Sequence, residues 1–163
     1  MILSLFAAAL VLQTPPPAPA PAPKPATRPA AEAKTDVVGS DHFLADFDAA
    51  VEVAKKEHKD LLVDFTGSDW CGWCKKLQAE VFTTKEFDTF AKGKLVLVEI
   101  DFPNQKKQTA ELKKANEALQ AKYKASGFPT IVALNGEGKE VWRQVGYMPG
   151  GPKAWIEKLE SLK

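Results

Sequence analysis

Residues 61–77 read LLVDFTGSDWCGWCKKL, and this stretch decides the fold. Leu61–Thr66 is a short apolar run that predicts a buried strand. Beyond it, apolar side chains recur at helical spacing from Cys74 to Val81, which predicts a helix. The pair Cys71 and Cys74 therefore falls where a strand gives way to a helix.

This position predicts redox chemistry for the two cysteines. A thiolate at a helix N-terminus lies near unpaired backbone N–H groups and the positive end of the helix dipole, which lower its pKa. We therefore expect Cys71 to be the exposed nucleophile. Cys74, one turn into the helix, would be close enough to form a disulfide with Cys71 and to resolve a mixed disulfide. Two cysteines so spaced at such a junction favour thiol–disulfide exchange.

Metal binding and haem attachment are two alternative uses of these cysteines. A zinc site needs two further ligands, and the two histidines, His42 and His58, have no ligand spacing. We interpret both as surface residues of the first helix region. Covalent haem attachment needs a histidine directly after the second cysteine, where this sequence has Lys75. The sequence thus predicts no metal and no cofactor.

The rest of the chain alternates predicted helices and strands. A hairpin turn is predicted at Asn135–Gly138, and Pro152 starts the last helix. The predicted elements are, in order, helix 44–58, strand Leu61–Thr66, helices over about 74–81 and 87–91, strand Leu95–Ile100, helix 112–123, strands Thr130–Leu134 and Val141–Val145, and helix 155–162. This order predicts an α/β fold whose mixed central sheet has helices on both faces.

Length and charge exclude several classes of protein. The chain has 163 residues, with 22 Lys and Arg against 21 Asp and Glu. A near-neutral chain has no general attraction for phosphate backbones, so nucleic acid is not an expected partner. No apolar run approaches the ~18 residues of a membrane-spanning helix. A disulfide between two cysteines so close together cannot stabilise the fold as a whole, so the hydrophobic core must do so.

The N-terminal part differs in composition from the rest. Ile2–Leu12 is an apolar stretch that fits the core of a signal peptide, although no Lys or Arg precedes it; a short hydrophobic anchor is the alternative. Eight of the 12 prolines lie between Pro15 and Pro29, which predicts an extended, disordered linker. We divide the chain into an export signal or anchor (1–20), a linker (21–38) and a folded domain (39–163), and expect a periplasmic or otherwise exported protein.

Three segments together resemble a known family: Val63–Phe65, Trp70–Lys75 and Gly127–Thr130. In this order they are similar to the thioredoxin superfamily over about residues 41–163. Residues 67–75, followed by residues 80–82, look like exported thioredoxin-like domains, including the C-terminal domain of the transmembrane reductase that supplies electrons to the bacterial periplasm.

The resemblance implies a thioredoxin-like fold and a set of site residues. It implies Cys71 as the nucleophile, Cys74 as the resolving thiol, and Pro129 as a cis-proline that faces the disulfide. It also implies that Asp64 assists proton transfer to and from the resolving cysteine. The lysine that accompanies this aspartate in many thioredoxins is replaced by an apolar residue near Leu97.

Asp64 also attracts attention without any resemblance, because it interrupts an otherwise apolar strand. Burial of a carboxylate is costly unless the group has a partner or a task, and it raises the pKa. The alternative is an aspartate at a strand edge, exposed to water. We favour the functional interpretation.

Four aromatic residues are candidates for substrate binding: Trp70, Trp73, Phe128 and Tyr147. The two tryptophans form a platform for an extended polypeptide or, alternatively, pack locally as apolar surface residues. Trp73 stands where typical thioredoxins have proline. The backbone of Phe128 would pair with the substrate main chain, and Tyr147 belongs to a turn that closes the groove or only leads into the last helix.

We therefore expect a protein thiol–disulfide oxidoreductase that works in the reducing direction without a cofactor. The expected partners are protein substrates with disulfides and a membrane or soluble thiol electron donor, and the expected state is a monomer. The alternatives are a disulfide oxidase or isomerase of the same geometry, or a non-enzymatic module that binds unfolded clients.

Near the cysteines, Asp69 would oppose thiolate formation, whereas Lys75 and Lys76 would favour it.

Overall fold

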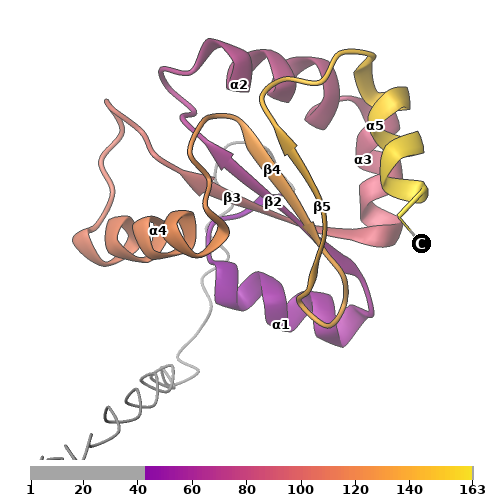
Figure 1. Ribbon diagram of the computed structural model, residues 1–163, viewed down its shortest axis with the longest axis horizontal. Coiled ribbons are helices and arrows are strands. Elements are labelled where there is room, and N and C mark those ends of the chain that lie inside the picture. Colours follow the sequence, from indigo (N-terminus) through magenta and orange to yellow (C-terminus); the bar gives the residue numbers. More distant parts are fainter. Residues whose placement is uncertain (1–42, 163) are drawn as a thin grey trace, which may run out of the picture. The chain divides into compact units, whose positions relative to one another are not determined.

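A computed structural model describes residues 43–162 of the protein. These residues form a mixed sheet of five strands in the order β1-β3-β2-β4-β5, with helices on both faces (Figure 1). The strands are β1 (Phe43–Leu44), β2 (Asp60–Thr66), β3 (Leu95–Asp101), β4 (Thr130–Leu134) and β5 (Glu140–Val145). The expected α/β, thioredoxin-like architecture is confirmed. The predicted signal at 1–20 and linker at 21–38 lie outside the described residues.

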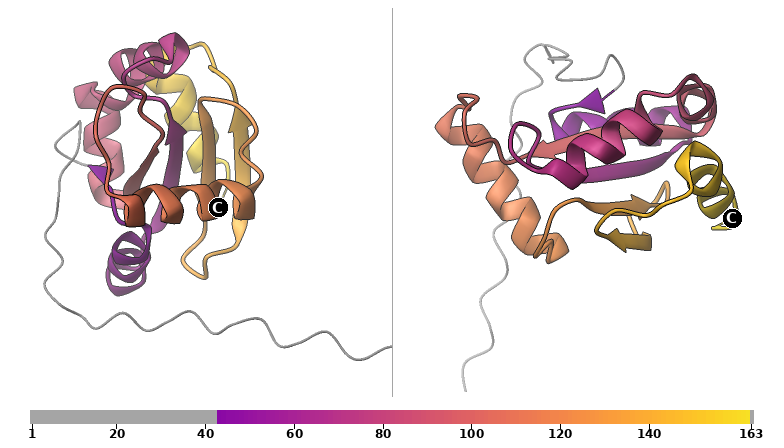
Figure 2. Two further views of the ribbon diagram at one scale, coloured as in Figure 1. Left: turned by 90° about the vertical axis from the view of Figure 1, so that its left-hand side faces the viewer. Right: turned by 90° about the horizontal axis from the view of Figure 1, so that it is seen from above.

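The helices are α1 (Phe47–Glu57), α2 (Gly72–Leu77), α3 (Lys85–Lys94), α4 (Ala110–Tyr123) and α5 (Gly151–Glu160), with a π-helical turn, η1 (Gln78–Phe82), between α2 and α3. Strand β2 runs parallel to β3 and antiparallel to β4, and β4 and β5 form the predicted hairpin. Helix α4 runs across the strands rather than along them (Figure 2).

Two core clusters occupy the two faces of the sheet, because side chains alternate along each strand. The first cluster packs Leu62 and Ile131 of the sheet against Leu77 of α2 and Trp155 of α5. The second joins Val63 and other sheet residues to α1 and α4. We call these the α3/α5 face and the α1/α4 face.

The start of the first helix differs from the prediction. The apolar spacing predicts a helix from residue 44, but Phe43–Leu44 is a strand that pairs with Leu97 and Val98 of β3. Helix α1 begins only after Asp46, whose side chain accepts hydrogen bonds from the backbone N–H groups of Asp48 and Ala49. This carboxylate cap ends the extended conformation, since it satisfies N–H groups that a helix start leaves unpaired.

Candidate active site

The two cysteines lie at the N-terminus of α2, directly after the loop that follows β2. Cys71 is the cap residue of the helix, and its Sγ accepts a hydrogen bond of 3.2 Å from the backbone N–H of Cys74. The two residues form a disulfide, with a Cα–Cα distance of 5.3 Å. The backbone N–H of Cys74, aimed at this sulfur, would also stabilise the Cys71 thiolate after reduction.

The exposure of Cys71 differs from the expectation of an exposed residue. In the disulfide form, Cys71 is 6% exposed and Cys74 is 4% exposed, so both are buried. The residues beside them are the exposed ones: Trp70 is 45% exposed and Trp73 is 58% exposed. The surface that an approaching molecule meets at this site is therefore largely indole.

One aromatic cluster flanks the disulfide through Trp70. The indole N–H of Trp70 donates to the carbonyl of Phe102 at 2.8 Å, and its ring lies edge-on to Phe128 at 5.9 Å. Phe128 in turn stacks on Phe102 at 5.2 Å. Gly67 permits this arrangement, because a Cβ there would lie 2.4 Å from the indole of Trp70. The peptide bond between Phe128 and Pro129 is cis, as the resemblance implied.

A second aromatic cluster forms around Trp73. Its ring lies 5.5 Å from that of Tyr147, and the Lys76 ammonium is 5.4 Å and 4.9 Å from the two ring centroids. The hydroxyl of Tyr147 donates to the carboxylate of Glu80, and this hydrogen bond raises the pKa of Tyr147. The structure thus divides the four predicted aromatic residues between two clusters, one with Trp70 and one with Trp73.

Asp69 has a structural partner that the sequence did not reveal. Its carboxylate accepts hydrogen bonds of 2.7–3.0 Å from the backbone N–H groups of Asn104, Gln105 and Lys106. These bonds hold the pKa of Asp69 below its usual value. Its main-chain carbonyl also accepts from Lys75 Nζ at 2.8 Å. The carboxylate therefore ties the cysteine loop to the loop after β3.

A second link joins the same two loops. Ser68 donates to Asp101 through its backbone N–H at 2.9 Å and through its hydroxyl at 2.6 Å. Lys106 Nζ lies 2.9 Å from the same hydroxyl oxygen. The chain between β2 and the cysteines is thus fixed at two consecutive residues, Ser68 to the end of β3 and Asp69 to the loop that follows it.

Asp64 is buried, 4% exposed, and its Oδ1 has no hydrogen-bond partner among the described residues. It lies on the α3/α5 face, two residues beyond Leu62, and α2 with Cys74 packs on this face. Burial raises its pKa well above the usual value, and the charges of Glu99 and Asp101 add to this effect. The alternative of an exposed strand-edge aspartate is wrong.

Glu99 is a site residue that the sequence analysis missed. In the parallel pairing of β2 and β3, Asp64 is in register with Glu99, whereas Leu97 pairs with Leu62 two residues earlier. Glu99 is 8% exposed, and burial together with the charge of Asp101 raises its pKa to about 7, although Lys106 acts in the opposite sense. The signal was present as a single charged residue within the apolar run 95–100.

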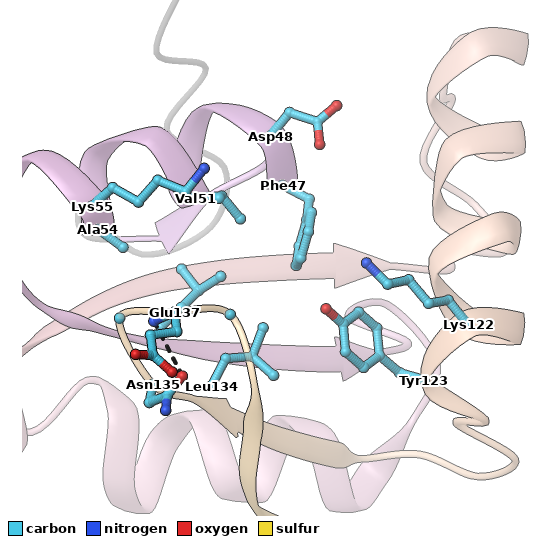
Figure 3. A pocket seen from close by; sticks show the side chains of 13 residues that line it. Phe47, Asp48, Val51, Ala54, Lys55, Lys122, Tyr123, Leu134, Asn135 and Glu137 are labelled. Carbon is cyan, nitrogen blue, oxygen red and sulfur yellow. Dashed lines mark hydrogen bonds between the residues drawn. The ribbon is translucent and has the colours of Figure 1, made fainter. Parts of the chain in front are cut away.

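A cavity elsewhere in the domain includes none of the predicted site residues. It has a volume of about 330 Å³ and lies between α1, the end of α4 and the β4–β5 turn, with Phe47 and Tyr123 pointing toward it (Figure 3). Within residues 43–162, no cluster of three or more His, Cys, Asp or Glu side chains is placed to hold a metal ion. In the same range no helix has the length and apolar character needed to cross a membrane.

The fold and the disulfide at the start of α2 define a thiol–disulfide oxidoreductase. Comparisons with known proteins agree. The family model of the thioredoxin-like domain matches residues 47–161, and the chain belongs to this family.

Curated relatives and solved structures fit this assignment. The chain is 43% identical over 112 residues to the disulfide bond reductase DsbH of Chlamydia pneumoniae, a match that covers 69% of this chain and 67% of the relative. It is 35% identical over 98 residues to the thioredoxin-related protein DsbJ of the same organism, covering 60% of this chain but only 28% of that longer protein.

A solved structure of the DsbH oxidoreductase superposes with a TM-score of 0.68 at 38% identity, covering 76% of this chain and 85% of that one. The oxidised C-terminal domain of DsbD from Neisseria meningitidis superposes with a TM-score of 0.56 at 22% identity, covering 74% and 99% of the two chains, which shows a common fold.

Proposed function

We propose that the protein reduces disulfides in protein substrates, with Cys71 as nucleophile and Cys74 as resolving thiol. The single observation that carries this assignment is the hydrogen bond from the Cys74 backbone N–H to Cys71 Sγ at the start of α2. It favours negative charge on Cys71 rather than on Cys74. The reducing direction is supported by the 43% identity to a protein named as a disulfide bond reductase.

The reaction consists of two exchange steps. The Cys71 thiolate attacks one sulfur of the substrate disulfide, which forms a mixed disulfide and releases one substrate thiolate. The Cys74 thiolate then attacks Cys71 Sγ, which forms the Cys71–Cys74 disulfide and releases the second substrate thiolate. The substrate gains two electrons and the protein loses two, so a membrane or soluble thiol donor must reduce the pair again.

The substrate approaches, in this proposal, between the two aromatic clusters. Trp70 and Phe128 lie in one cluster, and Trp73 and Tyr147 in the other. Their partly exposed rings suit an extended or unfolded polypeptide, because aromatic rings offer a large contact area. Pro129 faces the disulfide, and the backbone of Phe128 pairs with the substrate main chain.

Asp64 serves the second step. The resolving thiol must lose its proton before it attacks, and Asp64 is a buried carboxyl on the face that α2 covers. A carboxyl whose pKa is raised by burial accepts a proton more readily than an exposed carboxyl does. We assign it the role of proton acceptor from Cys74.

An assay of insulin reduction with two cysteine variants tests this function. We expect Cys71→Ser to abolish turnover, and Cys74→Ser to accumulate a mixed disulfide with the substrate. Limited alkylation of the reduced protein should label Cys71 before Cys74, and preferential labelling of Cys74 would contradict the assigned roles.

The same variants separate the alternatives. A redox potential measured against glutathione distinguishes a reductase from an oxidase or isomerase, because an oxidase has a less negative potential. If Cys71→Ser still binds clients and the parent protein shows no turnover, the protein is instead a non-enzymatic binding module.

For the cellular context we propose a monomer that is exported, with residues 1–20 as signal or anchor, 21–38 as linker and 39–163 as the catalytic domain. The apolar run and the proline-rich composition support this division. Cell fractionation with and without residues 1–20 tests it: loss of export on deletion is expected, and unchanged export would overturn it.

A further inference from the structure

Glu99 has no task in the function proposed above, although it is a buried charged residue beside a proposed catalytic carboxyl. Its in-register partner across the parallel strands is Asp64. Neighbouring strands lie about 4.8 Å apart, and in-register side chains point to the same face. The carboxyl groups of Asp64 and Glu99 are therefore neighbours on the α3/α5 face.

The outer side of Glu99 opens to a small cavity. Strand β1 ends at Leu44, which pairs with Val98, so no strand covers β3 at Glu99. A cavity of about 120 Å³ lies there instead, and its lining includes Glu99, Asp101, Lys106, Gln108 and Asn116. This volume has room for several water molecules among polar groups. Glu99 thus lies between the buried Asp64 and a space that water can enter.

The charges around Glu99 come from three parts of the structure. Asp64 faces it from β2 and Asp101 from its own strand, and Lys106 and Lys107 line the cavity from the loop after β3. Two carboxyl groups so close titrate as a pair, because ionisation of one disfavours ionisation of the other. Burial, and then the charges of Glu99 and Asp101, raise the pKa of Asp64 well above normal, whereas burial and the charge of Asp101 raise that of Glu99 to about 7.

This coupling limits what Asp64 can do alone. A protonated Asp64 cannot accept a proton from Cys74 unless it gives up the proton that it already holds. The Oδ1 of Asp64 has no hydrogen-bond partner among residues 43–162, and the carboxyl beside Asp64 is that of Glu99.

We propose that Glu99 is a positioning residue that relays protons between Asp64 and water in the cavity lined by Lys106. This inference rests on the proposed role of Asp64. As Cys74 attacks the mixed disulfide, its S–H bond breaks and the proton passes to one oxygen of Asp64. The proton on the other oxygen of Asp64 passes to the Glu99 carboxylate. Glu99 then releases a proton to water, and the substrate thiolate that leaves takes up a proton from solvent.

The test measures the resolving step itself. Reduced protein is mixed rapidly with insulin and quenched with acid, and the mixed disulfide is quantified by mass spectrometry between pH 6 and pH 8.5 (from about one unit below to about one and a half units above the value near 7). In the parent protein the resolving rate should rise with an inflection near pH 7, where Glu99 becomes ionised. In Glu99→Gln that inflection should disappear and the step should slow by about 10-fold, less than the roughly 10²–10⁴-fold cost of losing an acid–base group.

Two further variants separate a relay from a structural role. Glu99→Asp keeps the acid but loses a methylene, so it should retain the inflection and exceed Glu99→Gln in rate. If Glu99→Gln is the faster of the two, with the parental pH profile, the side chain only fills space and the relay is overturned. Glu117→Gln removes an exposed carboxylate from α4 and should match the parent.

The outcome for Asp64 keeps the two proposals apart. If Asp64→Asn resolves the mixed disulfide at the parental rate, the role of Asp64 fails and the relay fails with it. If Asp64→Asn is slow while Glu99→Gln is not, only the relay is overturned. Carbon-13 NMR of the side-chain carboxyls in the reduced parent protein adds a measurement without substitution. We expect the carboxyl signal of Asp64 to shift in the same pH range as that of Glu99. A titration of the Glu99 signal that leaves the Asp64 signal unchanged would contradict the relay.

Discussion

The two faces of strands β2 and β3 differ sharply although they share one backbone. On the α1/α4 face, these strands present only apolar side chains to the core, such as Val63, Val98 and Ile100. On the α3/α5 face, Leu62 and Leu97 are followed along the strands by Asp64 and Glu99 and then by Asp101. The polar residues thus gather on one face and at one end, where α2 places the disulfide. One face stabilises the sheet, and the other also holds the carboxyl groups to which we assign proton transfer.

The largest effect is expected when a new carboxylate is introduced on the α1/α4 face. Val63→Asp places a charge next to Asp64 in sequence but on the side where every neighbour is apolar, at a position that is 0% exposed. We expect the free energy of unfolding to fall by at least about 4 kcal/mol, because a buried charge without a partner is among the costliest changes.

Urea denaturation measures this effect. The size-reducing control Val63→Ala should cost about 2 kcal/mol. A loss for Val63→Asp no larger than that of the control would mean that the two faces tolerate charge equally.

The second effect is a change in how stability depends on pH. Because the pKa of Glu99 is raised in the folded protein from 4.5 to about 7, its favourable contribution is complete below its unfolded pKa and is lost as the pH rises through 7. For the parent protein we expect the free energy of unfolding to fall between pH 5 and pH 8, by at most about 3 kcal/mol from this group. Asp64 contributes in the same direction.

Urea titrations at several pH values should show a flatter profile for Glu99→Gln than for the parent. Glu117→Gln should keep the parental slope. If the free energy of unfolding of Glu99→Gln keeps the parental slope against pH, Glu99 ionises as it does in water. Ionisation on the α3/α5 face would then not destabilise the fold.

A smaller effect of opposite sign is expected from Asp69, five residues after Asp64. Backbone hydrogen bonds from residues 104–106 lower its pKa, so its contribution is present at neutral pH and is lost as the pH falls through the lowered value. Asp69→Asn should therefore melt at a lower temperature than the parent at pH 7. The difference should shrink as the pH falls below 3.8, the usual aspartate value. Calorimetry at both ends of this range checks the sign, and equal melting temperatures at pH 7 would refute it.

The smallest effect is expected from the N-terminal segment. Deletion of residues 1–35, which lie outside the described part of the chain, should change the free energy of unfolding by less than about 0.5 kcal/mol. In vitro insulin reduction should also stay near the parental rate. A large loss of stability would mean that this segment contributes contacts to the domain.

The elements of the fold follow from local patterns, and the details of the site do not. Apolar periodicity and turn residues predict the later strands and helices well, because each signal lies within one segment. Strand β1 was missed because it has two residues and exists only through its pairing with β3. The register that places Glu99 beside Asp64 is a property of two strands together. The apolar run 95–100 by itself therefore does not show that its one charged residue has a carboxyl neighbour.

The same reason applies to the partners of Asp69. From the sequence, it is a negative charge two residues before Cys71, and its effect on the thiolate is the natural concern. Its hydrogen-bond partners lie 35–37 residues further along the chain. Only the folded structure brings them together. The tryptophans are a similar case, since their position beside the cysteines can be read from the sequence but their division into two clusters depends on Phe102, Phe128 and Tyr147.

The anchoring of the loop after β3 by Asp69 has a consequence for amide hydrogen exchange. Surface loops normally exchange their amide hydrogens quickly, because water reaches them without any opening of the structure. The amides of Asn104, Gln105 and Lys106 lie in such a loop but donate to a carboxylate that belongs to the cysteine loop. Their exchange therefore needs the two loops to separate. The exchange rates of these three amides therefore report how often the chain next to the disulfide opens. No regular secondary structure protects the amides of this region.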